Sequence, residues 1–299
     1  MHQIIHTEWG QLPAIRLQHA SGAHATITLY GAHLVEWSTA DGVQRLFCSE
    51  LSSRDGSKAI RGGVPLIFPQ FAAQGDGMRH GFARVSLWRL QPGNLLPAGT
   101  DEKTAGHGTG PVCAAGFELR NADLTACIAQ AWPHEFALHA NMTLDHQSLT
   151  LQLGVENRGS TSFEFAAALH SYWQVNDLAE CRITGLKDLH YSDQAIVPAI
   201  AAHQTTAQLA IDGKIDRIYQ HFSTPLTLQS GAQQLSMQQH GFCDAVVWNP
   251  GAQDAAALTD MADEEYRKFV CIEAARINPL TLTSGERWQG WQRIEASPV

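Results

Sequence analysis

The sequence SLTLQLGVEN at residues 148–157 decides the fold class, because its apolar residues occupy every second position. The apolar set is Leu149, Leu151, Leu153 and Val155, and polar or small residues stand between them. Successive side chains of a β-strand point to opposite faces of its sheet. The alternation therefore predicts a half-buried strand with one face in the core.

The same period of two extends along the chain on both sides of this strand. Segment 25–37 begins with it and then breaks at Gly31, where we expect a bend or a bulge. Residues 127–148 suggest strands joined by short turns, and residues 225–249 add short strands separated by Ser-Gly and His-Gly turns. The C-terminal sequence GERWQGWQRIEA, residues 285–296, is expected to form the last strand.

Helical signals are few. The best is TDMADEEYRKF at residues 259–269, which offers Thr259 or Asp260 as a cap and carries acidic residues in its first turn. The chain shows no regular alternation of strands with helices, which disfavours a doubly wound parallel sheet.

These patterns predict an all-β protein with few short helices. We expect a large antiparallel arrangement with two packed sheets, forming a single domain over residues 1–299. The stretch 92–111 is rich in Gly, Thr and Pro and is expected to be a surface excursion between strands.

Composition excludes several classes of protein. The formal net charge of −9 disfavours a nucleic-acid partner, because phosphate binding needs clustered positive charge. The N-terminal residues do not have the pattern of a signal peptide, and we expect no membrane partner because no apolar run approaches a membrane span of roughly 20 residues. The six cysteines are far apart and include no CxxC, so we expect a cytoplasmic protein with reduced thiols and no metal site.

The first candidate site residues follow from RGGVPLIFPQF at residues 61–71. Arg61 opens this apolar run, and Arg79, His80 and Arg84 follow within two dozen residues. Taken singly, each arginine could cap a carbonyl or pair with an acid. As a set beside glycines that allow close approach of a ligand, they predict a site for polar or anionic groups, because guanidinium groups bind hydroxyl, carboxylate and phosphate oxygens.

The second candidate is His170 in TSFEFAAALHSYWQV, residues 161–175. Ala166 and Ala168 precede it on the same face of the expected strand and leave space beside it, and Tyr172 follows. Small residues beside a histidine and an aromatic ring are typical of a cavity wall. A core histidine satisfied by a nearby carbonyl is the alternative.

The third candidate is Glu273, the one acid in the middle of the apolar strand RKFVCIEAARI, residues 267–277. Burial of a carboxylate is costly unless it is paired, and it should raise the pKa of Glu273 into the range of a useful base. The alternative is a structural ion pair with Arg276 or Arg61.

Two further acids lie next to apolar residues. Asp216 in GKIDRIYQHF stands between Ile215 and Arg217, and its carboxylate could accept hydrogen bonds from two adjacent sugar hydroxyls. The alternative is an ordinary acid in a turn or at a strand edge. Asp244 in GFCDAVVWNP is interpreted as structural.

Taken together, six motifs carry a resemblance to a known family. AIRGGVPLIFPQF, RHGFAR, LHSYWQV, KIDRIY, DAVVWNP and KFVCIEA occur in an order and spacing similar to those of the hexose-6-phosphate mutarotases, the glucose-6-phosphate 1-epimerase branch of the aldose 1-epimerase superfamily. The resemblance runs from about residue 20 to about residue 295. It implies an antiparallel β-sandwich of the galactose-mutarotase type and the interconversion of α and β anomers of a hexose phosphate, with no cofactor or metal.

The resemblance also implies roles, residue by residue. His170 matches the general acid and Glu273 the general base, while Arg61, Arg84 and Asp216 match substrate-binding residues. His80 resembles the second histidine of the superfamily, which helps to hold the ring oxygen. Arg79 stands where relatives often carry another polar residue, and an added contact to phosphate is expected there.

Two departures from the family pattern bear on the site. Ala274-Ala275 follow the glutamate where relatives commonly have proline, which should alter the backbone without removing the base. Phe68-Pro69-Gln70 stand where many relatives have tryptophan, which should reshape the sugar platform.

Three alternatives to a hexose-phosphate mutarotase are considered. One is a mutarotase of free aldohexoses, and another is a non-catalytic carbohydrate-binding module on the same fold. A glycosidase would need two acids flanking the bond, whereas this set offers one acid and a histidine. The expected partner is a hexose phosphate substrate, and the expected state is a monomer or a weak homodimer.

Overall fold

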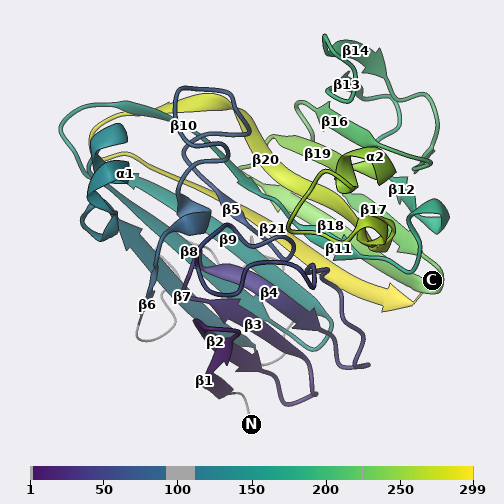
Figure 1. The fold of residues 1–299 in the computed structure, drawn as a ribbon, viewed down its shortest axis with the longest axis horizontal. Helices are drawn as coiled ribbons and strands as arrows, with labels where there is room; N and C mark the ends of the chain where they lie inside the picture. Colours follow the sequence, from purple (N-terminus) through teal and green to yellow (C-terminus); the bar gives the residue numbers. More distant parts are fainter. Residues whose placement is uncertain (1–2, 92–111, 224, 299) are drawn as a thin grey trace.

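The computed structural model describes residues 3–91, 112–223 and 225–298, and its described strands form three antiparallel sheets (Figure 1). The smallest sheet has the order β1-β2-β3-β4. Its strands are β1 (Gln3–Trp9), β2 (Leu12–Gln18), β3 (His24–Thr28) and β4 (His33–Ser38). The all-β prediction is thus confirmed.

The second sheet has eight strands in the order β14-β13-β16-β19-β20-β10-β5, and β11 pairs with β20 beside this path. Its strands are β5 (Leu66–Ile67), β10 (Phe163–Leu169), β11 (Tyr172–Gln174), β13 (His190–Asp193), β14 (Ile200–His203), β16 (Ile215–Tyr219), β19 (Asp244–Asn249) and β20 (Phe269–Leu282).

The third sheet has nine strands in the order β15-β12-β17-β18-β21-β9-β8-β7-β6. Its strands are β6 (Arg89–Gln91), β7 (Cys113–Arg120), β8 (Phe136–Leu144), β9 (Ser148–Asn157), β12 (Arg182–Thr184), β15 (Gln208–Ala210), β17 (Leu226–Ser230), β18 (Gln233–His240) and β21 (Arg287–Pro298).

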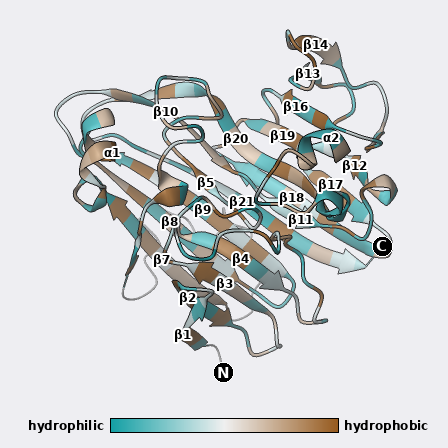
Figure 2. Ribbon diagram, in the orientation of Figure 1, coloured by the Kyte–Doolittle hydropathy of each residue, from teal (hydrophilic) through white to brown (hydrophobic). Residues whose placement is uncertain are grey.

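The main core joins the three sheets. Phe165 on β10 packs against Trp288 on β21, with ring centroids 5.4 Å apart, and Trp37 on β4 packs edge-on against Trp173 on β11 at 6.3 Å. Figure 2 shows the alternation of apolar and polar residues along the strands that supplies this core. Burial of these apolar faces between sheets is the main stabilising contribution of such a layered fold.

The strand that decided the fold class is β9, with the predicted bounds 148–157. Its four apolar side chains are buried, but Thr150 and Gln152 on the other face are buried too, so the half-buried prediction is wrong for that face. Side chains of β8 and β21, the two neighbours of β9 in the sheet, lie beside these polar residues, and Gln152 Nε2 donates a hydrogen bond to Gln289 Oε1 at 3.1 Å.

Other strand predictions are mostly confirmed. The chain bends between β3 and β4, where Gly31 has a φ of +80°. Strands β17, β18 and β19 occupy residues 225–249, and β21 is the last strand. The segment 92–111 lies outside the described residues.

The helix predictions are less accurate. The described helices are α1 (Ala126–Ala131) and α2 (Gly251–Ala255), with 3₁₀ turns η1 (Ala83–Val85), η2 (Asn121–Asp123), η3 (Leu178–Glu180) and η4 (Asp263–Lys268). The segment 127–148 was expected to be strands throughout, whereas α1 occupies its start.

The predicted helix over residues 259–269 is wrong in type and in bounds. The structure has only the 3₁₀ turn η4, with Ala262 as its cap, because strand β20 begins at Phe269. Asp260 does not cap a helix; its side chain pairs with Arg61.

Candidate active site

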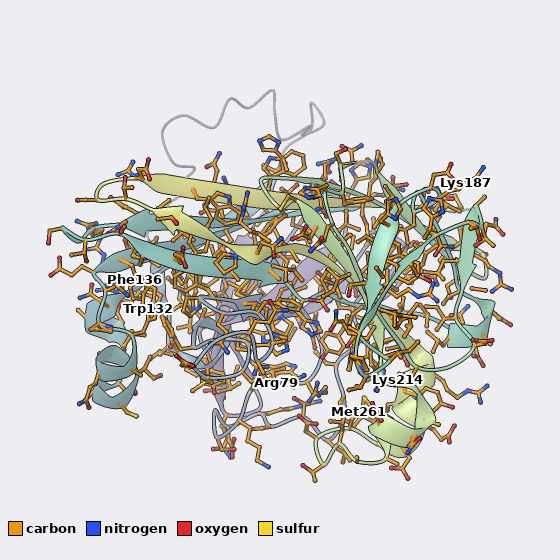
Figure 3. The ribbon with its side chains drawn as sticks, turned by 90° about the horizontal axis from the view of Figure 1, so that it is seen from above. Arg79, Trp132, Phe136, Lys187, Lys214 and Met261 are labelled. Atoms are coloured by element: carbon orange, nitrogen blue, oxygen red, sulfur yellow. The ribbon has the colours of Figure 1, made fainter. Side chains whose placement is uncertain are left out.

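A cavity of about 380 Å³ gathers all seven residues that the sequence predicts for a site. These are Arg61, Arg79, His80, Arg84, His170, Asp216 and Glu273. Its size lies within the usual range for small-molecule sites, roughly 300–1,000 Å³. Figure 3 shows Arg79 on the same side of the molecule as Lys214 and Met261, which are near neighbours in sequence of the cavity residues Asp216 and Asp260.

His170 stands immediately after β10, where the strand ends at Leu169. Its ring stacks on Tyr172 at 5.1 Å between centroids and meets Trp248 edge-on at 5.9 Å. Nδ1 is buried and has no hydrogen-bond partner in the described chain. The aromatic contacts therefore fix the orientation of the imidazole while leaving its polar atom free for another group.

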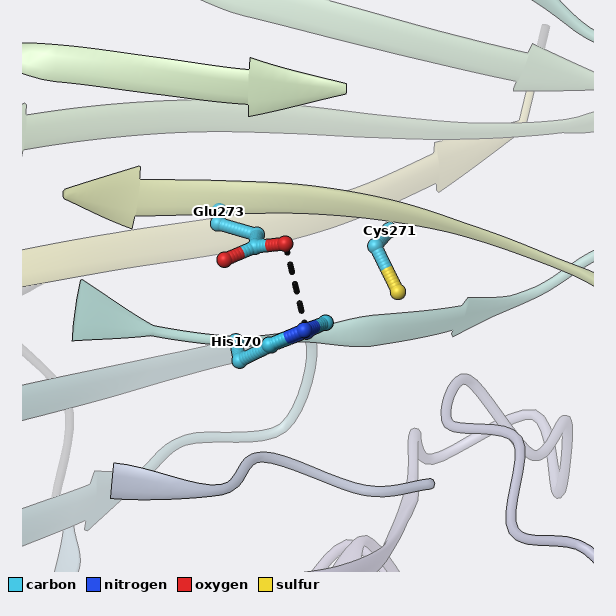
Figure 4. Close-up of side chains that lie close together, drawn as sticks. All are labelled: His170, Cys271 and Glu273. Carbon is cyan, nitrogen blue, oxygen red and sulfur yellow. Dashed lines mark ion pairs between the residues drawn. The ribbon is translucent and has the colours of Figure 1, made fainter. Parts of the chain in front are cut away.

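Glu273 lies in β20 between β19 and β10, and its side chain is 1% exposed. Oε1 lies 3.3 Å from His170 Nδ1, although the two atoms are not in hydrogen-bonding geometry, and Oε2 has no partner among the described residues (Figure 4). Neither Arg61 nor Arg276 pairs with it, so the structural ion pair that was the alternative does not form.

Burial dominates the electrostatics of this pair. Desolvation raises the pKa of Glu273 well above its ordinary value, and the negative charge of Asp216 raises it further. Desolvation lowers the pKa of His170, with smaller contributions from His80 and the cavity arginines. Both directions favour the uncharged forms of the two side chains.

Arg61 is held by two partners. Its Nη2 lies 3.1 Å from Asp260 Oδ2, and its Nη1 donates to the Tyr172 hydroxyl at 3.1 Å. The two glycines that follow serve the packing of the chain and not an approach to ligand. Both have positive φ, and a Cβ would collide with backbone atoms of Phe47 at Gly62 and of Leu34 at Gly63.

Arg84 differs from Arg61 because no carboxylate pairs with it in the part of the chain that the structure describes. Its Nη2 donates to the carbonyl oxygen of Arg79 at 2.9 Å, and its buried Nε has no partner. Burial lowers the pKa of Arg84, as do the positive charges of Arg61 and Arg79. A partly buried cation without a counter-charge is the arrangement expected where an anionic ligand binds.

His80 is held in one tautomer by the backbone. Its Nδ1 accepts a hydrogen bond from the Ala72 N–H at 3.2 Å, so in the neutral ring the proton is on Nε2. Burial and the nearby positive charges of Arg84, Arg79 and Arg61 lower the pKa of His80 to about 3. The ring is therefore a neutral hydrogen-bond donor, 5.4 Å from His170 between centroids.

The loop that carries Arg79 and His80 is tied down by Gln70. Gln70 Oε1 accepts from the Gly77 N–H at 2.9 Å, and Nε2 donates to the carbonyl oxygens of Ala72 and Gly77. Gln70 does not line the cavity, whose aromatic wall consists of Phe71, Tyr172 and Trp248.

Asp216 lies on β16, opposite Trp248 of β19 in the strand register. Burial raises its pKa to about 6, an effect that Lys214 partly opposes. Its carboxylate therefore changes charge just below neutral pH.

Sequence reasoning missed Asp260 and Trp248 as cavity residues. Trp248 stands in the quoted motif DAVVWNP, which was a usable signal. Asp260 looked like a helix cap, and nothing local to it indicates a partner 199 residues away. The residues that could hold a metal ion are His170, Glu273 and the neighbouring Cys271.

Comparisons with known proteins agree with this geometry. The sequence model of the aldose 1-epimerase family matches residues 13–295. A protein of Cenchrus ciliaris named "Putative glucose-6-phosphate 1-epimerase" is 30% identical over 295 residues, covering 96% of this chain and 85% of that protein. A protein of Escherichia coli with the same name is 30% identical over 84% of this chain and 79% of its own length.

Solved structures show the same fold. A Salmonella typhimurium protein described as "a putative mutarotase" superposes with a TM-score of 0.84 at 26% identity, covering 99% of this chain and 94% of that one. Galactose 1-epimerase from Lactobacillus acidophilus has a TM-score of 0.68 at 14% identity, covering 100% and 99% of the two chains. Among the described helices none is long and apolar enough to cross a membrane. The chain is therefore an isomerase that belongs to the aldose 1-epimerase family.

Proposed function

We propose that this chain interconverts the α and β anomers of a hexose 6-phosphate by opening and closing the sugar ring. The observation that carries this proposal is the juxtaposition of the His170–Glu273 pair with Arg84, a cation of the same cavity that lacks a carboxylate partner in the described chain. A neutral hexose leaves that charge uncompensated, whereas a phosphate compensates it. The names of the relatives from C. ciliaris and E. coli point to the same substrate.

The reaction needs one proton removed and one proton delivered. Glu273 takes the proton from the C1 hydroxyl, and His170 delivers one to the ring oxygen, so that the ring opens to the aldehyde. Rotation about C1–C2 and closure with the proton transfers reversed yield the other anomer. Each positioned acid or base supplies about 10²–10⁴-fold in such steps. No electron or group is transferred, so the mechanism uses no cofactor.

The pKa directions refine this mechanism. Burial favours a protonated Glu273 and a neutral His170. The two side chains together then hold the one exchangeable proton that the reaction needs, and His170 Nδ1 lies 3.3 Å from Glu273 Oε1. Hydrogen bonds from sugar hydroxyls to the Glu273 carboxylate compensate its desolvation, and the bound substrate thereby favours the ionised arrangement that starts ring opening.

The remaining cavity residues bind and orient the sugar. His80 donates through Nε2 toward the ring oxygen side, and Asp216 accepts from hydroxyls. Arg61 is already compensated by Asp260, so it suits hydroxyl contacts, while Arg84 and the exposed Arg79 suit the phosphate. The apolar faces of Trp248 and Tyr172 supply a platform for the ring.

The cellular setting follows from the same chemistry. Hexose phosphates are charged and are found inside cells, and all six cysteines are free thiols, which supports a reducing compartment. We therefore infer a cytoplasmic enzyme whose partner is the small-molecule substrate.

The test compares anomerisation of glucose 6-phosphate with that of glucose by exchange NMR at equal concentrations. We expect kcat/KM to be about 10–100-fold higher for the phosphate, since a charge-assisted hydrogen bond contributes about 1.5–3 kcal/mol. Equal or faster turnover of glucose would identify a mutarotase of free aldohexoses. Binding of either sugar without turnover would identify a binding module.

A further inference from the structure

A thiol lies beside the acid–base pair and takes no part in the mechanism above. Cys271 precedes Glu273 by two residues on β20, so both side chains point to the same face, toward His170 (Figure 4). One ligand atom from each of the three residues, namely a ring nitrogen of His170, Cys271 Sγ and a Glu273 carboxylate oxygen, lies within 4.8 Å of the others. Cys271 is fully buried and does not line the cavity.

The spacing suits a small tetrahedral ion. Zinc binds nitrogen and oxygen at about 2.0–2.1 Å and sulfur at about 2.3 Å, which places its ligand atoms about 3.3–3.6 Å apart. His170 Nδ1 and Glu273 Oε1 are already 3.3 Å apart. The Cys271 thiol lies within 4.8 Å of the other two ligand atoms, so it has to come closer to them to complete a three-ligand set.

The three donors also suit one class of cation. Thiolate and imidazole favour borderline or soft ions such as Zn²⁺ and Cd²⁺, whereas Mg²⁺ and Ca²⁺ require sets of oxygen ligands. Binding of the ion releases the proton of the Cys271 thiol and that of the Glu273 carboxyl to solvent. The resulting set of a divalent ion, one thiolate, one carboxylate and a neutral imidazole has no net charge, which is favourable in a desolvated site. His170 Nδ1 and Glu273 Oε2 are buried atoms without hydrogen-bond partners in the described chain, so a ligating ion displaces nothing from them.

We infer that His170 Nδ1, Cys271 Sγ and the Glu273 carboxylate form an inhibitory site for one thiophilic divalent cation, with the fourth coordination position open to the cavity. The bound ion removes the proton acceptor and the proton donor from the reaction at once. The binding stands on the geometry alone, while the inhibition rests on the proposed function. Occupation by the ion and by the sugar is mutually exclusive, since both need the same two side chains.

The experiment uses the full chain, freed of metal by a chelator and then dialysed. Cd²⁺ is titrated and the ultraviolet thiolate-to-cadmium charge-transfer band is recorded, and in parallel Zn²⁺ is added to the anomerisation assay. We expect one band-forming ion per chain and loss of at least nine-tenths of the activity at saturating Zn²⁺. A chelator should restore the activity, and Mg²⁺ should have no effect. Absence of the band in the wild type would overturn the proposal whether or not the protein anomerises sugars.

Two cysteine variants provide the decisive comparison. Cys271→Ser should keep the basal activity, lose the cadmium band and need more than about tenfold more Zn²⁺ for half-inhibition, because even supporting groups around a metal commonly contribute that much. Cys127→Ser removes an exposed thiol on α1 and should leave both readouts as in the wild type. Persistence of band and inhibition in Cys271→Ser would overturn the assignment.

A further measurement keeps the proposal testable if Cys271→Ser does not fold. In the wild type, glucose 6-phosphate at saturating concentration should reduce the cadmium band, because sugar and ion compete. A band that is insensitive to the sugar phosphate would place the ion elsewhere and overturn the proposal. Histidine pairs such as His190 and His203, whose ring centroids are 4.9 Å apart, contain no sulfur and give no thiolate band.

Discussion

Two hollows lined by charged residues of the described chain differ in how their charges are compensated. The larger, here called the outer hollow, has a volume of about 600 Å³. It lies over β7, β8, β9 and β21, and its lining includes Glu118 and Glu156. Glu118 pairs with Arg120 at 2.9 Å, and Glu156 pairs with Arg287 at 3.1 Å. The smaller, here called the inner hollow, is the candidate active site, where no lysine or arginine of the described chain pairs with the Glu273 carboxylate and where Arg84 pairs with no described carboxylate.

The difference indicates that size is a poor guide to function in this protein. Paired charges at a surface contribute about 0–1 kcal/mol each and need no further explanation. A buried polar atom without a partner costs about 1–3 kcal/mol, so its presence calls for a reason. Groups with strongly shifted pKa values and buried groups without partners cluster at sites where a bound ligand supplies the missing charge or hydrogen bond. Both glutamates of the outer hollow pair with arginines, although Arg120 Nε has no hydrogen-bond partner among the described residues, whereas Glu273 and Arg84 in the inner hollow have no such pairing.

The largest effect should come from removing the acid–base pair. We expect Glu273→Gln and His170→Asn each to lower kcat by about 10²–10⁴-fold, because each removes one proton-transfer group. Glu273→Gln preserves the shape of the side chain and should not lower the melting temperature, whereas His170→Asn loses the ring contacts with Tyr172 and Trp248 and should lower it. Exchange NMR measures the rate and calorimetry the stability.

The matched control lies in the outer hollow. Glu156→Gln removes a carboxylate that pairs with Arg287, and it should leave kcat and KM unchanged. If Glu156→Gln reduced activity as much as Glu273→Gln, or if Glu273→Gln stayed within a few-fold of the wild type, the contrast between the hollows would fail.

An intermediate effect should come from the uncompensated arginine. We expect Arg84→Gln to lower kcat/KM for glucose 6-phosphate by about 10–100-fold and to change the rate on glucose much less, because only the phosphate pairs with that cation. Arg287→Gln, in the outer hollow, is the control and should change neither rate. Equal losses on both sugars for Arg84→Gln would show that it binds the hexose itself.

Much of this arrangement could be predicted from the sequence. The alternation of apolar and polar residues indicates which side chains of a strand enter the core. It predicted β9 and the three strands within residues 225–249. Glu273 and His170 could be singled out because each is a polar residue in or directly after an apolar strand, but their choice over a structural role rested on the resemblance of six motifs to a known family. Their roles, and the single-domain organisation of residues 1–299, stay predictions.

What could not be predicted depends on long-range packing. Arg61 and Asp260, which form an ion pair, are 199 positions apart in the sequence. Local propensity assigns Asp260 to a helix cap, so nothing near it in the sequence indicates this pairing. The positive φ of Gly62 and Gly63 reflects a close approach of Phe47 and Leu34 that only the folded chain reveals. The proximity of Cys271 to His170 likewise depends on the register of β11 on β20 and of β10 on β20.

The smallest effect should be a pH dependence caused by Asp216. Burial raises its pKa from 3.8 to about 6 in the folded protein, so its carboxyl binds a proton more tightly in the folded state than in the unfolded state. The stability that this proton provides is fully present below about pH 4 and is lost as the pH rises through about 6. Asp216→Asn should remove that loss, which is on the order of 1 kcal/mol after allowance for solvent screening.

The same ionisation should appear in substrate binding. Below about pH 6 the protonated Asp216 has fewer acceptors for sugar hydroxyls, so we expect KM to rise several-fold between pH 7 and pH 5. The phosphate of the substrate titrates near the same pH, with a pKa of about 6, so the two contributions have to be separated. In Asp216→Asn the pH dependence of KM that comes from the phosphate remains and the part that comes from the carboxyl is absent. The control is Asp254→Asn, which removes an exposed carboxylate paired with Lys214 and should behave as the wild type. If KM of Asp216→Asn depends on pH in the same way as KM of the wild type, Asp216 does not contact the sugar. The groups of the inner hollow that a ligand compensates would then be His170, Glu273 and Arg84.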